Sequence, residues 1–287
     1  MPTDARSAGE PADPPETDVL ATGDPRLVIE RAGESLARDP VRNNVLLTLL
    51  HARVVDPQPG RYWVVGADPL GVVFQSPLGF FALVSSMSSE DVSAVVNVMT
   101  KARIRLPGVN GEATTAARFA GAWTEATKSS AVPVEGQRLY EAREIIIPTG
   151  VPGAFRPAAP EDFDVLVEWT QSFMTEIGEE HNGDAAATVA LRLPLGRYWL
   201  WDDEGAASMA SLTEPTAGVV RVQAVYTPDD RRRRGYASAC VAALSSRALA
   251  DRHRCILYTD LANATSNSIY RSIGFRAVSE VLRYRFA

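Results

Sequence analysis

Residues 219–250, VVRVQAVYTPDDRRRRGYASACVAALSSRALA, decide the fold of this chain. They begin with a run of β-branched and aromatic residues of strand length, which a Thr-Pro-Asp-Asp turn ends. Small and apolar residues then recur at three- and four-residue steps over residues 237–248, which predicts one apolar helix face. Four consecutive arginines and Gly235 lie between the strand and the helix. The stretch therefore predicts a buried strand, a basic turn and a long amphipathic helix.

The basic turn has the features of a diphosphate site. A helix start leaves backbone N–H groups unpaired and carries a partial positive charge of about half a unit. Gly235 allows close approach of the backbone to a ligand, and the arginines at positions 231–234 add positive charge beside it. The alternative is a solvated basic turn without a ligand. Nucleic acid is a less attractive partner, because the formal net charge is -6 and no second basic cluster is evident.

Two motifs resemble the signature of the GNAT superfamily of acetyl-CoA-dependent N-acetyltransferases. The first, Gln/Arg-x-x-Gly-x-Gly/Ala between a strand and a helix, reads RRRGYA over residues 232–237. The second, Asn-x-x-Ser/Asn-x-x-x-Tyr-x-x-x-Gly-Phe, resembles residues 263–275, which follow an apolar strand at 255–260. Ser266 is predicted as the N-cap of a short helix that Gly274 ends.

The resemblance implies acetyl-CoA as cosubstrate, with its pantetheine arm between two splayed strands. It also implies that Tyr270 protonates the departing thiolate, which suits a phenol with a pKa near about 10. An ordinary half-buried helix tyrosine is the alternative for Tyr270, and a loop Asx turn is the alternative for Asn263. The implied coenzyme contacts are Val225, Tyr226, Thr227, Arg232, Arg233, Arg234, Gly235, Tyr236, Ala237, Ser238, Asn263 and Ser266.

The residues that would bind the acceptor amine are less clearly indicated by the sequence. In this family the helical stretch 173–181 contacts the acceptor, and here it offers Phe173, Glu176 and Glu180 as candidates. Their carboxylates would attract a cationic amine, although a solvated helix end explains the same charges. The general base stays unidentified. Arg233 stands where many relatives have glycine, so a positive φ at this position would strain the turn.

The rest of the chain predicts two similar halves. The tetrapeptide GRYW occurs at residues 60–63 and again at 196–199, each time opening an apolar strand after a helical stretch. We therefore expect tandem GNAT-like α/β domains, each a mixed, mostly antiparallel sheet flanked by helices. The first half lacks both motifs and is interpreted as degenerate, without a coenzyme turn. The expected order is a disordered tail over residues 1–23, the degenerate domain over 24–147, a linker over 148–152 and the acetyl-CoA-binding domain over 153–287.

The amino-acid composition further restricts the class of protein, its location and its partners. Hydrophobic residues make up 46% and charged residues 22%, as in soluble globular proteins, and the first residues lack the apolar core of a signal peptide. Cys240 and Cys255 are predicted to be buried free thiols rather than a metal pair. We expect a cytoplasmic monomer or homodimer that binds no metal, nucleic acid or membrane.

Over its whole length the chain loosely resembles two-domain acetyltransferases of actinobacterial type. This resemblance implies transfer of an acetyl group from acetyl-CoA to a primary amine of a small molecule or peptide, by direct attack in a ternary complex. The alternative is a non-catalytic module that binds acetyl-CoA or a partner.

Overall fold

The computed structural model describes residues 17–178 and 184–287. The first half contains β1 (Val19–Thr22), α1 (Pro25–Ala37), α2 (Asn44–Val55), β2 (Arg61–Val65), β3 (Gly71–Gln75), β4 (Ala82–Val84), α3 (Ser89–Lys101), β5 (Gly108–Glu112), α4 (Ala113–Thr127) and β6 (Ala131–Ala142). The second half contains β7 (Ala154–Pro157), the 3-10 turn η1 (Pro160–Asp162), α5 (Phe163–Glu176), α6 (Ala185–Arg192), β8 (Tyr198–Asp202), β9 (Ala206–Leu212), β10 (Val219–Tyr226), η2 (Asp229–Arg231), α7 (Tyr236–Ala250), β11 (Arg254–Asp260), α8 (Ala264–Ser272) and β12 (Phe275–Phe286).

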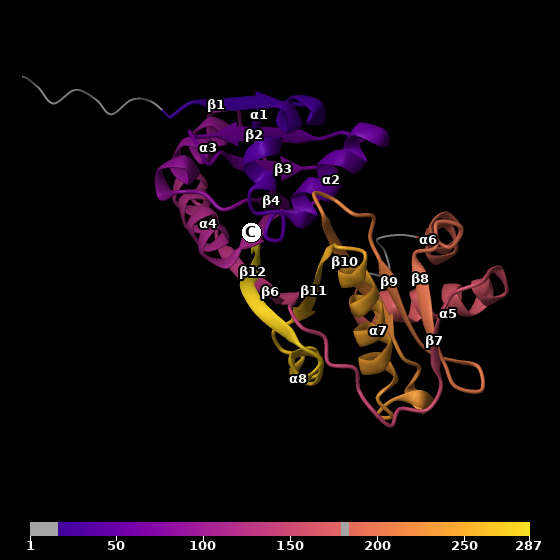
Figure 1. Cartoon of the computed structure of the whole chain (residues 1–287). Coiled ribbons are helices and arrows are strands. Elements are labelled where there is room, and N and C mark those ends of the chain that lie inside the picture. Colours follow the sequence, from indigo (N-terminus) through magenta and orange to yellow (C-terminus); the bar gives the residue numbers. More distant parts are fainter. Residues whose placement is uncertain (1–16, 179–183) are drawn as a thin grey trace, which may run out of the picture.

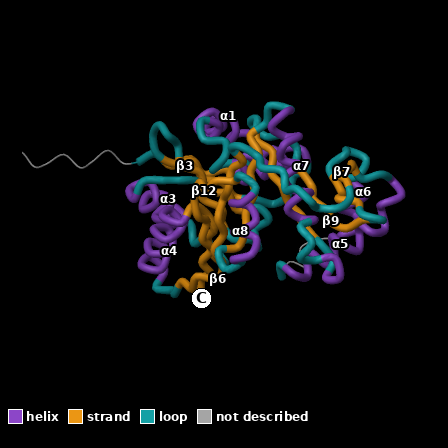
Figure 2. The backbone as a smooth tube through the Cα atoms, turned by 60° about the horizontal axis from the view of Figure 1, so that its bottom comes forward, coloured by secondary structure: helices purple, strands orange, loops and turns teal. Residues whose placement is uncertain are grey.

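The described strands form one mixed sheet of 12 strands, flanked by helices (Figure 1 and Figure 2). Their order is β1-β2-β3-β4-β5-β12-β6-β11-β10-β9-β8-β7, so the second half repeats the strand order of the first from the opposite edge. The mixed α/β class predicted from the sequence is confirmed, but the two halves share one sheet instead of forming a sheet each.

The two halves exchange their last strands. β12 lies between β5 and β6 of the first half, and β6 lies between β12 and β11 of the second half. Figure 1 shows the yellow C-terminal strand ending among the elements of the first half. Because both exchanged strands pair antiparallel along 12 residues each, each half completes the sheet of the other. The division at residues 148–152, which form no helix or strand, stays a prediction for independent domains.

The repeated GRYW tetrapeptide has the same structural role in both halves. Tyr62 packs with α1 and α2, whereas the next residue, Trp63, packs with α3 and α4 on the other face. Tyr198 packs with α5 and α6, whereas Trp199 packs with α7. This two-residue alternation is what a strand covered on both faces requires.

The predicted disordered tail is wrong over residues 17–23. β1 pairs antiparallel with β2, from Val19 opposite Val65 to Thr22 opposite Tyr62. Four residues are too few to show a strand period in the sequence, so the pairing with β2 decides their structure. The rest of the predicted tail, residues 1–16, lies outside the described residues.

Gly274 closes α8 in a conformation that other residues resist, with φ of 102°. A Cβ atom at this position would lie 1.8 Å from the carbonyl oxygen of Glu144. We expect Gly274→Ala to lower the free energy of unfolding by at least about 2 kcal/mol, because the clash is with backbone. Gly121→Ala is the control, since nothing lies within 4 Å of its added methyl on α4. It should raise stability by about 0.5 to 1 kcal/mol in the same urea titration, and equal effects of the two changes would contradict the expectation.

Candidate functional site

β10 and β11 separate in the middle of the sheet and form a fork. Their parallel pairing runs from Val219 opposite Arg254 to Val222 opposite Leu257. Both strands continue beyond this point, β10 to Tyr226 and β11 to Asp260. The fork therefore opens at residues 222 and 257, and backbone groups of residues 223–226 on the β11 side are free of that neighbour.

A β-bulge in β10 lies at the opening of the fork. The register with β9 shifts between Gln223 and Tyr226, and Ala224 has φ of 48°. Val222 packs in the core cluster around α7, yet Ala224 and Tyr226 pack in the cluster around α5. In an unbroken strand the side chains of residues 222, 224 and 226 would point to one face of the sheet. The bulge therefore moves the side chains of residues 224 and 226 to the opposite face.

The basic turn, residues 228–235, ends at an open helix start. Arg233 has φ of 64° and Gly235 has φ of 85°, so the backbone turns through two left-handed residues. Among the described residues, none accepts a hydrogen bond from the backbone N–H groups of Tyr236, Ala237 or Ser238. Free N–H groups at such a turn form a concave site for an anion. The positive φ expected to strain Arg233 is present.

The matching helix of the first half, α3, is closed at its start. Ser88 accepts a hydrogen bond from the Asp91 N–H, and the Asp91 carboxylate accepts from the Ser88 backbone N–H, which is a complete capping box. The capping box occupies the N–H groups of Ser88 and Asp91, whereas no side chain of the described residues caps the start of α7. The two halves therefore differ in the capping of this helix start.

The arginines of the basic turn divide into engaged and free side chains. Arg232 donates to the carbonyl oxygen of Thr227 at 2.8 Å, pairs with Glu176 and with Asp229, and lies 5.8 Å from the ring centre of Tyr226. Its guanidinium is therefore held by protein groups. Arg233 forms no ion pair within the described part of the chain, and Arg234 makes one bond of 3.3 Å to the carbonyl oxygen of Asp230. These last two exposed side chains are the available cations.

The turn between β8 and β9 contacts the start of α7 and holds it in place. The Tyr236 hydroxyl donates to the Asp203 carboxylate at 2.5 Å, so this side chain points into the core and away from a ligand. Arg231 donates to the carbonyl oxygen of Asp203 at 3.3 Å. Val151 of the connecting segment lies against Gly235, with 3.0 Å to the position of a Cβ. Two separate segments thus fix the geometry of the basic turn.

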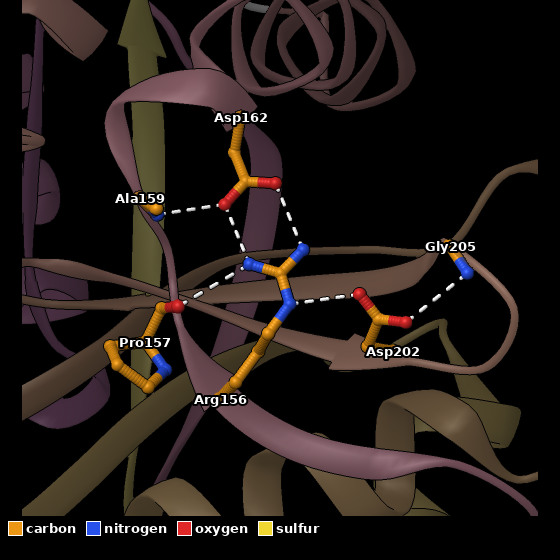
Figure 3. Close-up of polar contacts among 6 residues, drawn as sticks. All are labelled: Arg156, Pro157, Ala159, Asp162, Asp202 and Gly205. Carbon is orange, nitrogen blue, oxygen red and sulfur yellow. Dashed lines mark hydrogen bonds and ion pairs between the residues drawn. The ribbon is translucent and has the colours of Figure 1, made fainter.

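That supporting turn is itself anchored by Arg156 (Figure 3). Arg156 binds both oxygens of Asp162, at 2.6 and 2.9 Å, and binds Asp202 through Nε at 2.8 Å. The Asp202 carboxylate also accepts from the Gly205 N–H at 3.1 Å. The guanidinium lowers the pKa of both carboxyl groups, so they stay charged at neutral pH. We interpret this network as structural, joining β7, η1 and β8.

The second motif forms α8, but its cap differs from the prediction. Asn263 is the N-cap and accepts from the Ser266 N–H at 2.9 Å, so the prediction that Ser266 caps the helix is wrong. The helix starts earlier because an Asn side chain caps as well as Ser and stands before the turn. Asn263 is thus a helix cap rather than a loop Asx turn, whereas Gly274 ends the helix as predicted.

The sequence analysis did not single out Asn267, which positions α8 through its hydrogen bonds. It is 4% exposed, accepts from the Tyr140 hydroxyl at 2.9 Å and donates to the carbonyl oxygens of Asp260 and Asn263 at 2.8 Å. These bonds fasten α8 to β11 and to the exchanged strand β6. A second asparagine four residues after Asn263 was the available signal in the sequence.

Tyr270 lies on α8 and packs with the core cluster around α7, as does Val225 at the end of β10. Its ring meets Phe275 edge-on, with 6.0 Å between ring centres. The hydroxyl makes no hydrogen bond to a described residue. Burial raises the pKa of Tyr270 to about 12, so the phenol carries its proton at neutral pH. Such a group can donate a proton or a hydrogen bond to a developing thiolate.

Of the three acceptor candidates, Glu176 lies beside the basic turn. Phe173 packs in the core cluster around α5, and Glu176 reaches Arg232 from the last turn of that helix. Glu180 lies outside the described residues. The structure therefore brings Glu176 to the site but neutralises its charge with Arg232.

Both cysteines are buried, as predicted. Burial raises the pKa of the Cys240 thiol and of the Cys255 thiol to about 12. Because the thiolate is the reactive form, we expect no labelling of the native protein by a thiol reagent near neutral pH, and two labels after denaturation. The raised pKa values stabilise the fold below the unfolded value of about 9, and this contribution is lost as pH rises towards about 12. Rapid native labelling would contradict the expectation.

Comparisons with known proteins agree with this geometry. Residues 203–284 match the family model described as FR47-like protein, and no curated protein matches the chain. A GNAT-family acetyltransferase from Colwellia psychrerythraea is similar in structure, with a TM-score of 0.65, 10% identity, and coverage of 94% of this chain and 100% of that one. A GCN5-related N-acetyltransferase from Sphaerobacter thermophilus gives 0.57 and 13%, covering 95% and 96%.

A third similar structure is a glucosamine N-acetyltransferase region in a fungal multi-domain GH3 β-N-acetylglucosaminidase. It has a TM-score of 0.57 and 12% identity, and the alignment covers 96% of this chain and 39% of that one. No described helix is both long and apolar enough to span a bilayer. The FR47-like segment contains both motifs on which the sequence prediction rests. The chain therefore has the fold seen in solved GNAT acetyltransferases, and within its second half residues 203–284 match the FR47-like model.

Proposed function

We propose that this chain transfers an acetyl group from acetyl-CoA to a primary amine of a small molecule or peptide. The observation that supports this most directly is the open start of α7 beside the β10–β11 fork. A diphosphate needs free N–H groups and cations, and a thioester arm needs strands that have separated; both conditions occur on adjacent segments of the second half. The first half, whose α3 is capped by Asp91, would then be a supporting half.

The proposed assignments follow from this arrangement. The N–H groups of Tyr236, Ala237 and Ser238 would hold the diphosphate, with Arg233 and Arg234 beside it. The backbone of residues 223–227 would bind the pantetheine arm and the thioester carbonyl. Arg232, whose guanidinium is engaged, would contribute its backbone and charge. Asn263 and Ser266 would stay near the arm through α8, with their cap bond unchanged.

In the proposed reaction, the amine nitrogen attacks the thioester carbon and forms the amide bond. The carbon–sulfur bond breaks, and the leaving thiolate takes the proton of the Tyr270 hydroxyl. The amine gives its surplus proton to solvent, and bulk water reprotonates Tyr270. Most of the rate gain would come from holding the amine and the thioester together, as in other bimolecular transfers.

A non-catalytic acetyl-CoA-binding module is the second candidate. The pairing of Glu176 with Arg232 favours it, because this pair neutralises a carboxylate that would otherwise attract or deprotonate an amine. Calorimetry with acetyl-CoA alone would not separate the candidates, since both would bind it. The predictions of a cytoplasmic location, of a monomer or homodimer, and of no nucleic-acid or membrane partner belong to both.

The deciding experiment is an acetyl-CoA thiol-release assay with a panel of small amines, amino acids and lysine peptides. The buried Cys240 and Cys255 should give little background in the native protein. Amine-dependent thiol release, with a product heavier by one acetyl group, would support the enzyme. Tight binding of acetyl-CoA without release for any amine would favour the module, and absence of binding would overturn both.

A further inference from the structure

A partly buried arginine lies at the fork, on the face away from α7. Arg221 on β10 precedes Val222, the last residue paired with β11, and neighbouring strand residues point to opposite faces. Val222 packs in the cluster around α7, so the Arg221 side chain lies on the other face, which α2 of the first half covers. Tyr258 of β11 shares that face, where it packs in a central cluster with Val41.

This guanidinium has no carboxylate partner among the described residues. Its Nη1 donates to Asn44 Oδ1 at 3.2 Å, the one hydrogen bond that its side chain makes within the described part of the chain. Burial lowers the pKa of Arg221; Tyr258 opposes this shift, and the positive charge of Arg192 adds to it. By contrast, Arg156 and Arg254 are each bound by at least one carboxylate. Even a partly buried cation without a counter-ion is costly, so it points to an absent anion.

Asn44 gives an independent sign of a missing acceptor. The residue is 0% exposed, its Oδ1 is used by Arg221, and its Nδ2 has no hydrogen-bond partner among the described residues. Within the described part of the chain, Arg221 and Asn44 therefore have more donors than acceptors, since Asn44 Oδ1 serves Arg221 and Asn44 Nδ2 is left without a partner. Buried donors are normally satisfied, so the deficit calls for an acceptor from outside the chain.

We infer that the acceptor amine carries an anionic group, a carboxylate or a phosphate, and that Arg221 and Asn44 bind this group on the face of the fork opposite α7. The inference rests on the proposed function and narrows it to one class of acceptor. In the proposed function the backbone of residues 223–227 binds the thioester carbonyl, and this segment begins two residues after Arg221. An amine held through a neighbouring anionic group would thus reach the thioester from the face away from the basic turn.

The test uses matched acceptors that differ only in the anionic group. One pair is an amino acid and its amide, another is phosphoethanolamine and ethanolamine, and a third is glucosamine 6-phosphate and glucosamine. Each is assayed by thiol release with the wild type, with Arg221→Gln, and with Arg247→Gln, which removes an exposed arginine on α7. The first pair reports a carboxylate, whereas the other two report a phosphate.

For one anionic acceptor we expect kcat/KM at least about tenfold above that of its neutral partner, chiefly through KM. Arg221→Gln should remove this preference and keep kcat/KM for the neutral amine within about twofold of the wild-type value. Arg247→Gln should keep the preference. No preference in the wild type, or the same preference in Arg221→Gln, would overturn the inference while leaving acetyl transfer in place.

Thermal melting tests the same site without catalysis. The anionic amines should raise the Tm of the wild type but not that of Arg221→Gln. Arg221→Met should melt at or above the wild-type temperature without ligand, because it removes an unpaired buried charge. A purely structural Arg221 would instead make Arg221→Met melt lower, which would overturn the inference. If no amine is acetylated, the proposed function fails, and the melting shifts alone decide whether the anion site exists.

Discussion

Tyr270→Phe is expected to lower kcat about 100-fold and to leave the Kd for acetyl-CoA within about twofold. The phenol is the one group of α8 that we place at the leaving sulfur, and phenylalanine keeps the ring contact with Phe275. Because burial raises the pKa of Tyr270 to about 12, the wild-type acid stays protonated through the neutral range. Activity that depends on it should therefore fall only as pH rises towards that value. Steady-state kinetics and calorimetry give the two numbers.

Tyr284→Phe is the matched control for this prediction. Tyr284 lies on β12 in the core of the first half, so the change removes one hydroxyl far from the fork. It should leave kcat within about twofold. If Tyr270→Phe kept full turnover on the best acceptor, Tyr270 would be the ordinary packed tyrosine of the alternative interpretation. An equal loss in both variants would indicate a general loss of structure.

Ser238→Asp is expected to weaken acetyl-CoA binding about 100-fold without destabilising the protein. Ser238 is the third residue of α7, the position that Asp91 holds in α3. By analogy with Asp91, a carboxylate there would accept from the backbone N–H of Gly235, and its negative charge would repel a diphosphate. The same carboxylate interacts favourably with the helix dipole, by about 0.3 to 1 kcal/mol, so Tm should stay level or rise.

The combination of weaker binding and retained stability makes this test specific. Ser246→Asp adds the same charge in the middle of the same helix and should leave the Kd within about threefold. Calorimetry and thermal melting on the three proteins measure both effects. Unchanged affinity in Ser238→Asp would show that the coenzyme does not use the start of α7, and the proposed site would fall.

Sequence patterns predicted those parts of the site that depend on neighbours along the chain. The strand at 219–226, the turn with Gly235 and the helix that follows carry local signals, namely β-branched runs, turn residues and a helical period. The same holds for Gly274, because a left-handed helix end selects glycine wherever it occurs. The repeated GRYW indicated two halves, since equal strands need equal alternation of buried side chains.

Contacts between segments that are distant in the sequence could not be predicted from such local patterns. The exchange of β6 and β12 depends on which edges meet, and each strand would suit either half. The short strand β1 exists because β2 offers it an edge. The pairing of Arg232 with Glu176 changed the role expected of that arginine, since residues 56 positions apart in sequence carry no mutual signal.

The sequence by itself determined the open helix start, because capping chemistry is local: Gly235 before α7 gives no side-chain cap, whereas Ser88 before α3 and Asp91 in its first turn form a capping box. Only the tertiary structure decided what faces the fork. Arg221 meets Asn44 across 177 positions of sequence, and its lack of a carboxylate within the described chain becomes visible only when α2 covers β10. Charge balance in a buried site is a property of all the segments packed there, so no single stretch of sequence can set it.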